Sequence, residues 1–363
     1  MSRYKLEEFI SYEQPAKYIV DSDQYDDSYE IPVLTAGKSF ILGYTDEKNN
    51  LFDDLPVIIF DDFTTSVQFV DFPFKVKSSA MKLLKNTEQA DIKYCYYLLK
   101  FLQHTPENHK RQWLSATSQN TVELPTIEEQ KNIVKKLDKI LEVIDNQNKQ
   151  LELLDEAIKA RFVEMFGDPV HSEKYGTRKL SSCVAEKSDM VDGPFGSQVN
   201  TKVDYIENGE IPVIRTVNVK MMSFSPTDLK YMTREKYETV IRSQVLPGDV
   251  ILTKVGTIGN VCIFPNAFDE AVLSTTGSCR IRVDNSVVNT QFFAYNLMYL
   301  KGKLLEIASA GVQPFLNMNH VKNIDILDVS LEKQKEFADF VKEIDKSRLL
   351  NNHSLFLIKF ITF

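Results

Sequence analysis

The stretch that decides the fold is residues 127–165, IEEQKNIVKKLDKILEVIDNQNKQLELLDEAIKARFVEM, which contains neither proline nor glycine. Apolar side chains recur in it at heptad spacing: Leu137, Ile140, Ile144, Leu151, Leu154 and Ile158. Such a sustained seam predicts a helix that packs against another helix. At about 1.5 Å per residue it would be roughly 57 Å long, which is long for a helix packed only on its own domain.

A second stretch near the C-terminus, residues 331–363, has a similar stripe. Its apolar positions are Phe337, Val341, Ile344, Leu355 and Ile358. We expect the two helices to pair as an antiparallel coiled coil that separates two globular domains; the alternative is that each packs on its own domain.

Both seams turn polar near the middle, at Gln147 in the first and Asn351 in the second. In a two-fold antiparallel pair these positions would meet at the centre and fix the register of the helices. The alternative is that both side chains are solvated.

Sequence landmarks before the two helices recur in the same order, which predicts an internal duplication. The matches pair Tyr4-Lys5-Leu6 with Arg178-Lys179-Leu180, Ile31-Pro32-Val33 with Ile211-Pro212-Val213, residues 56–59 with 249–252, residues 91–102 with 289–300, and residues 127–130 with 331–334. Each match is weak alone, and their shared order carries the inference. Short strand-like runs bounded by Gly, Pro, Asn and Asp, followed by aromatic-rich helices, predict an α+β fold for each copy.

The resulting boundaries are residues 1–125 and 167–330 for the two α+β domains, and residues 126–166 and 331–363 for the two helices. Composition excludes several other classes. With 23 Phe and 15 Tyr but only 13 Gly and 13 Pro, the chain of 363 residues is not disordered. It has no apolar run long enough for a membrane span. Four scattered cysteines fit reduced thiols in a cytoplasm, not a disulfide framework or a zinc site.

A net charge of −8 disfavours a nucleic-acid binder when it is taken as a sum. The charge is uneven, however, because residues 72–111 carry eight basic and three acidic residues. A local basic face is therefore compatible with an acidic chain.

Three motifs stand out: Leu124-Pro125-Thr126-Ile127-Glu128-Glu129-Gln130 at the helix start, Arg161-Phe162-Val163-Glu164-Met165-Phe166-Gly167-Asp168-Pro169 at its end, and the glycine turn Lys254-Val255-Gly256-Thr257-Ile258-Gly259-Asn260. Together they resemble one known family, the specificity (S) subunits of type I restriction–modification systems. The resemblance covers nearly the whole chain. The second helix lacks a counterpart of residues 166–169, so we expect it to be shortened.

The resemblance implies two target-recognition domains, each a mixed sheet with helices, in pseudo-two-fold repeat on an antiparallel coiled coil. It implies a cytoplasmic, non-catalytic subunit that reads a bipartite, asymmetric site in double-stranded DNA. It also implies two modification (methyltransferase) partners, with restriction subunits where these exist. S-adenosylmethionine would be bound by the methyltransferases and no cofactor by this chain. No metal site is expected.

Cationic, hydroxyl and amide side chains at probable strand ends are the candidate DNA contacts, because such groups bind phosphates and base edges. In the first domain they are Thr35, Lys38, Thr64, Thr65, Ser66, Lys75, Lys77, Ser78, Ser79, Lys110 and Arg111. In the second domain they are Arg215, Thr216, Asn218, Lys220, Lys254, Thr257, Asn260, Ser274, Thr275, Thr276, Arg280, Arg282 and Gln313.

Two other functions remain open from the residues alone. One is a two-domain interaction protein on a coiled-coil strut, without a DNA role. The other is a nuclease that uses an acidic site around Asp61 and Asp62, although no third carboxylate stands at a telling spacing.

Overall fold

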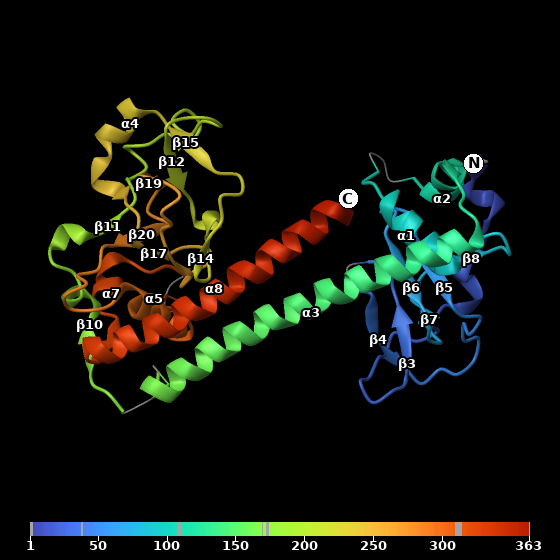
Figure 1. Ribbon diagram of the computed structural model, residues 1–363, viewed down its shortest axis with the longest axis horizontal. Coiled ribbons are helices and arrows are strands. Elements are labelled where there is room, and N and C mark those ends of the chain that lie inside the picture. Colours follow the sequence, from blue (N-terminus) through green and yellow to red (C-terminus); the bar gives the residue numbers. More distant parts are fainter. Residues whose placement is uncertain are drawn as a thin grey trace. The chain divides into compact units, whose positions relative to one another are not determined.

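The computed structural model describes residues 3–37, 39–106, 110–168, 170–171, 174–308 and 314–362, without the side chains of 350–362 (Figure 1). The chain divides into two compact units, Met1–Asn146 and Gln147–Phe363. The boundary lies inside the long helix α3 (Ile127–Phe166), so each unit includes one half of that helix.

The first unit is built on two small sheets. A four-stranded sheet has the order β2 (Ile10–Glu13), β8 (Met81–Asn86), β5 (Val57–Asp61), β6 (Val67–Val70). A three-stranded sheet has the order β4 (Ile41–Thr45), β3 (Ile31–Leu34), β7 (Lys75–Val76). A separate pair joins β1 (Arg3–Lys5) to β9 (Thr121–Glu123), and the helices are α1 (Ile92–Phe101) and α2 (Gln112–Ser115).

The second unit repeats this plan with additions. Its first sheet has the order β11 (Met190–Asp192), β20 (Ser278–Ile281), β17 (Val250–Thr253), β18 (Val261–Ile263). Its second has the order β15 (Lys230–Met232), β12 (Ile211–Ile214), β19 (Ala271–Leu273), β16 (Gln244–Val245). Two further pairs join β10 (Thr177–Lys179) to β21 (Asp325–Leu327) and β13 (Val219–Lys220) to β14 (Ser223–Phe224). The helices are α4 (Arg234–Thr239), α5 (Thr290–Tyr299), α6 (Lys301–Ala308), α7 (Met318–Lys322) and α8 (Leu331–Thr362).

The predicted duplication is confirmed by this strand order, because β2-β8-β5-β6 corresponds to β11-β20-β17-β18 in chain position and neighbours. The predicted α+β class is confirmed as well. A buried glutamine at the start of each long helix makes an equivalent hydrogen bond in both copies. Gln130 accepts a hydrogen bond from the backbone N–H of Asp91 at 2.7 Å, and Gln334 accepts one from the N–H of Asn289 at 2.7 Å. Asp91 and Asn289 each cap the helix that follows.

Helices α3 and α8 run antiparallel within the second unit (Figure 1). Arg161 pairs with Glu336 at 2.5 Å, and Asp155, farther back along α3, pairs with Arg348, farther along α8. Phe162 and Phe337 pack edge to face with ring centroids 5.3 Å apart. The predicted antiparallel coiled coil is therefore present in this unit.

The predicted seam is only partly buried. Ile158, Phe337 and Val341 are fully buried, whereas the others with described side chains are half-buried: Leu137, Ile140, Ile144, Gln147, Leu151, Leu154 and Ile344. The side chains of Asn351, Leu355 and Ile358 lie outside the described residues. The meeting of Gln147 with Asn351 therefore stays a prediction, although Oε1 of Gln147 is buried and has no hydrogen-bond partner among the described residues.

The four cysteines are buried free thiols. Burial raises the pKa of the Cys279 thiol to about 12, which keeps it protonated and unreactive near neutral pH. In the described part of the chain, no group of three metal-ligating side chains comes together. Nor does any described helix combine the length and apolarity that crossing a membrane requires.

Candidate nucleic-acid interface

Loops in the second unit gather where a parallel pair of strands ends. β12 and β19 are parallel, with Val213 opposite Val272 and Ile214 opposite Leu273. The N–H of Ser274 donates to the carbonyl of Ile214 at 2.9 Å. The segments that follow, residues 215–218 and 274–277, therefore leave the sheet at one edge.

The glycine turn between β17 and β18 joins the same edge. The backbone N–H of Lys254 donates to the carbonyl of Gly277 at 2.8 Å, which places the turn beside residues 274–277. Gly256 and Gly259 have φ values of +73° and +80°, a backbone region that favours glycine, as the turn requires. We call these three segments, residues 215–218, 254–260 and 274–277, the loop edge of the second unit.

The first unit has an equivalent loop edge. β3 and β7 are parallel, with Leu34 opposite Val76, and the N–H of Lys77 donates to the carbonyl of Leu34 at 2.9 Å. The N–H of Asp62 donates to the carbonyl of Ala80 at 3.2 Å, just as Lys254 does to Gly277. Residues 35–37, 39–40, 62–66 and 77–80 form this edge. The fold thus brings together most of the sequence-predicted candidates of each domain.

Several candidates are exposed or half-exposed in these loops, in the way a DNA contact requires. In the first unit they are Thr35, Thr64, Ser66, Lys77, Ser78 and Ser79. In the second unit they are Arg215, Thr216, Thr257, Asn260, Ser274, Thr275 and Thr276. Lys220 is exposed on β13, and Lys110 and Arg111 are exposed before α2. Lys38 and Gln313 lie outside the described residues.

Some of these exposed groups are already engaged with neighbours. Lys77 pairs with Asp23, and Arg215 pairs with Asp228 at 2.8 Å. Thr64 donates to the carboxylate of Asp61 at 2.7 Å. The side chain of Lys220, in contrast, has no hydrogen bond or ion pair among the described residues.

Buried side chains require a correction to the sequence prediction. Lys75 is fully buried and pairs with Glu47 at 2.5 Å, and Lys254 is buried against Asp192. Asn218 is fully buried, and its side-chain N–H groups bond the carbonyls of Ser225 and Thr227 at 3.0 and 3.1 Å.

Thr65 is also buried, because its hydroxyl donates to the carbonyl of His104 at 2.6 Å. Lys75, Lys254, Asn218 and Thr65 therefore shape the loops and do not face a ligand. Spacing alone gave no signal of this, because their partners are distant in the sequence.

Arg280 and Arg282 also need correction, because they do not join the loop edge. In β20, Ser278 pairs with Thr253 next to the loop edge, whereas Ile281 pairs with Val250 at the other end. Arg280 is 4% exposed.

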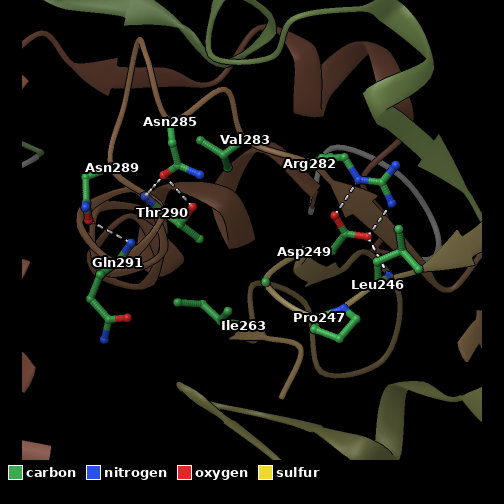
Figure 2. Close-up of a pocket in the computed structure, with 11 residues that line it drawn as sticks. Leu246, Pro247, Asp249, Ile263, Arg282, Val283, Asn285, Asn289, Thr290 and Gln291 are labelled. Atoms are coloured by element: carbon green, nitrogen blue, oxygen red, sulfur yellow. Dashed lines mark hydrogen bonds and ion pairs between the residues drawn. The ribbon is translucent and has the colours of Figure 1, made fainter. Parts of the chain in front are cut away.

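Arg282 holds Asp249 by two bonds of 2.8 Å at the rim of a pocket of about 460 Å³ (Figure 2). On the other side of this pocket, Asn285 accepts from the N–H and hydroxyl of Thr290 (Figure 2).

Sequence reasoning missed exposed apolar side chains at the second loop edge. Val217 and Val255 are about half exposed within it. Phe195 belongs to a neighbouring loop, since a Cβ on Gly193 would lie 2.2 Å from the carbonyl oxygen of Thr275. Apolar groups of this kind contact thymine methyls in DNA grooves. Only their exposure in the fold reveals them.

The acidic pair considered for a nuclease is occupied by structural contacts. Asp62 is fully buried and lies 3.2 Å from the ammonium of Lys82, and it also accepts from the N–H of Trp113 at 2.9 Å. Asp61 accepts from the N–H of Phe63 at 2.8 Å, at the start of the turn. Neither carboxylate is directed to an open site.

Comparison with known proteins bears on this arrangement. Residues 191–358 match the family described as the type I restriction modification DNA specificity domain. The chain is 38% identical over 222 residues to the specificity subunit of the type I restriction enzyme EcoR124I/EcoR124II of Escherichia coli. The predicted resemblance is confirmed: over these residues the chain is similar to type I specificity subunits.

The match with the Escherichia coli subunit covers 58% of this chain and spans 53% of that subunit, about half its length. The MjaVIII specificity subunit of Methanocaldococcus jannaschii is 25% identical over 309 residues, covering 74% of this chain and 67% of that subunit. The crystal structure of the type I S subunit from M. genitalium has a TM-score of 0.61 at 14% identity, covering 99% of this chain and 93% of that one. This last likeness concerns the fold alone.

Proposed function

We propose that this chain is the sequence-reading subunit of a type I modification complex. The loop edges, one in each unit, would contact two parts of a bipartite site in double-stranded DNA. The observation that carries the proposal is the repetition of the loop edge at the same point of the repeated fold, after β3 and β7 and after β12 and β19. The family resemblance supports the same conclusion.

The two edges differ in side chains, which supports an asymmetric site. The first turn carries Thr64 and Ser66, whereas the second is a glycine turn with Thr257 and Asn260. Hydroxyl groups of this kind bond base edges, and cations such as Lys220 bond phosphates, whereas the Asn260 amide is bonded to Val219 and Lys301 and shapes the turn. Shape and charge at each edge would therefore select a different half-site.

The chain itself would be non-catalytic in this proposal. Two methyltransferase subunits would carry S-adenosylmethionine, and restriction subunits would join where they exist. The site of action would be the cytoplasm, where the DNA substrate lies. Because the chain has a net charge of −8, we expect weak DNA affinity without its partners, which would supply much of the positive surface.

A methylome tests the proposal. The chain would be co-expressed with its neighbouring methyltransferase gene in a host without other methylation, and modified bases would be read by single-molecule sequencing. Methylated adenines in one gapped, asymmetric motif are expected. A symmetric gapped motif would mean that one recognition domain is silent. With the methyltransferase present and folded, absence of any motif would instead favour a coiled-coil interaction protein without a DNA role.

A further inference from the structure

A second group of cations lies at the other end of the second unit's sheet, away from the loop edge. A pocket of about 490 Å³ opens there, beside β11 and β20. The charged residues that line it are Lys187, Asp189, Arg242, Arg280, Arg282 and Lys322. We call this the basic pocket. Its members come from four separate stretches of the sequence, so only the fold unites them.

The charge balance of the basic pocket is unusual for this acidic chain. Five cations and one carboxylate line it. Lys187, Arg242 and Lys322 are exposed and have no ion pair among the described residues. Like charges gathered in one concave site raise the local concentration of anions.

Arg280 is the central feature of the pocket, because its guanidinium is buried without a carboxylate at ion-pair distance among the described residues. One nitrogen donates to the carbonyl of Gln244 at 3.2 Å and another to the carbonyl of Ser188, while Nε is buried with no partner. Burial and, next, the nearby charge of Arg282 lower the pKa of Arg280. A buried charge without a counter-charge is costly, so an anion at this site would relieve that cost.

Arg282 is fixed in place at the rim. Figure 2 shows both of its contacts with Asp249, which is itself buried. Its backbone N–H also bonds the carbonyl of Asp189 at 2.8 Å. Arg280 and Arg282 are thus held in place by the fold, and Lys187, Arg242 and Lys322 add exposed cations around them.

We propose that the basic pocket binds a phosphate group. Guanidinium groups match the oxygens of phosphate better than those of most anions. With Asp249, the partner of Arg282, included, five cations face two carboxylates, and this excess of positive charge suits a dianion. The proposed function supplies a source, a backbone phosphate of the bound DNA, and a free phosphate is the other source of the same chemistry. The pocket would then position the recognition domain without reading bases.

Inorganic phosphate tests the pocket without relying on the proposed function. The melting temperature of the full chain would be followed against phosphate concentration, with sodium chloride at equal ionic strength as reference. We expect a rise of about 2–3 °C at phosphate ten times its dissociation constant. The double variant R242Q/K322Q should lose this rise while it still folds, because both side chains are exposed and unpaired among the described residues.

K335Q is the matched control, since Lys335 is exposed on α8. It should keep the phosphate-specific rise. Equal melting temperatures of the wild type in phosphate and chloride would overturn the proposal, and so would an equal rise in R242Q/K322Q.

DNA binding by the complex assembled with its methyltransferase identifies the source of the phosphate. If the pocket holds a backbone phosphate, R242Q/K322Q should reduce the slope of log affinity against log salt by about one. An unchanged slope in R242Q/K322Q, together with a phosphate-specific rise that the wild type shows and this variant loses, would assign the pocket to free phosphate. If the wild-type complex does not bind DNA at all, the proposed function is wrong. The melting temperatures in phosphate would then test the pocket independently of it.

Discussion

At the scale of single residues, Lys75 is a predicted DNA contact that has a structural role in the fold. The sequence places it near a predicted strand end, two residues before Lys77, where a phosphate-binding cation could stand. In the fold its ammonium is fully buried and bonds Glu47 at 2.5 Å and Asn49 at 3.4 Å. Removing one partner of such a buried pair destabilises the fold strongly, because the other partner then remains as an uncompensated buried charge.

Lys75→Ala should therefore destabilise the first unit by about 3–5 kcal/mol. The salt slope of DNA binding by any folded protein should not change. Chemical unfolding and binding at several salt concentrations measure the two quantities. A normal stability together with a shallower slope would return Lys75 to the DNA interface.

The pair with Glu47 also predicts a pH dependence. Burial would raise the pKa of Glu47, but the bond from Lys75 and the backbone N–H groups of Asp21 and Ser22 outweigh it, and the pKa is lowered. Its stabilisation is complete above the ordinary pKa of glutamate and is lost as pH falls through the lowered value. In Glu47→Gln this acid-side loss should disappear from the stability profile of the first unit.

Lys220 is the opposite case, an exposed cation without a partner among the described residues. Lys220→Ala should reduce the salt slope of the assembled complex by about one and change stability by less than about 0.5 kcal/mol. Lys48→Ala is the control, because Lys48 is exposed and follows β4 at the end of the sheet opposite the loop edge. Equal slopes for Lys220→Ala and the wild type would remove Lys220 from the interface.

At the scale of elements, the two buried glutamines explain why the long helices begin where they do. Gln334 is 2% exposed, and its amide bonds both the N–H of Asn289 and, at 2.7 Å, the carbonyl of Val329. Gln130 makes the same two bonds in the first unit, to Asp91 and Pro125. Each glutamine therefore ties the start of a long helix to the start of the aromatic helix beside it.

Gln334→Ala should lower the free energy of unfolding by about 1–3 kcal/mol for each buried backbone group that loses its partner. Calorimetric or denaturant unfolding of the full chain would measure the loss. Lys335→Ala, one residue along the same helix and exposed, should change stability by less than about 0.5 kcal/mol. Similar stabilities for the two variants would mean that the glutamine bonds contribute nothing net.

At the scale of the whole molecule, the length of α3 bears on the spacing of the DNA site. If the proposed function holds, seven residues inserted into the first half of α3 would keep the heptad seam and add about 10 Å. At about 3.4 Å per base pair, the methylated motif should gain up to about three base pairs of spacer with unchanged half-sites. The methylome of the variant complex would measure this. An altered half-site sequence would contradict the proposed separation of reading and spacing.

Much of the molecule could be predicted from local pattern. The heptad seam around Leu151 and Ile158 indicated the long helix, and the repeated Ile-Pro-Val at residues 31–33 and 211–213 contributed to the prediction of a duplication. Such features depend on residues close together in the chain, and periodicity records which side of an element is apolar. Helix, strand and duplication were therefore determined by the sequence itself.

Only the tertiary structure decided which candidates are free to bind. Lys75 and Lys220 both lie in short strands. Lys75 is buried and pairs with Glu47, whereas the side chain of Lys220 is exposed and has no partner among the described residues. The parallel pairing of β12 with β19 and the basic pocket around Arg280 likewise join segments far apart in the sequence. Burial and pairing depend on neighbours in space, and a single sequence does not state those neighbours.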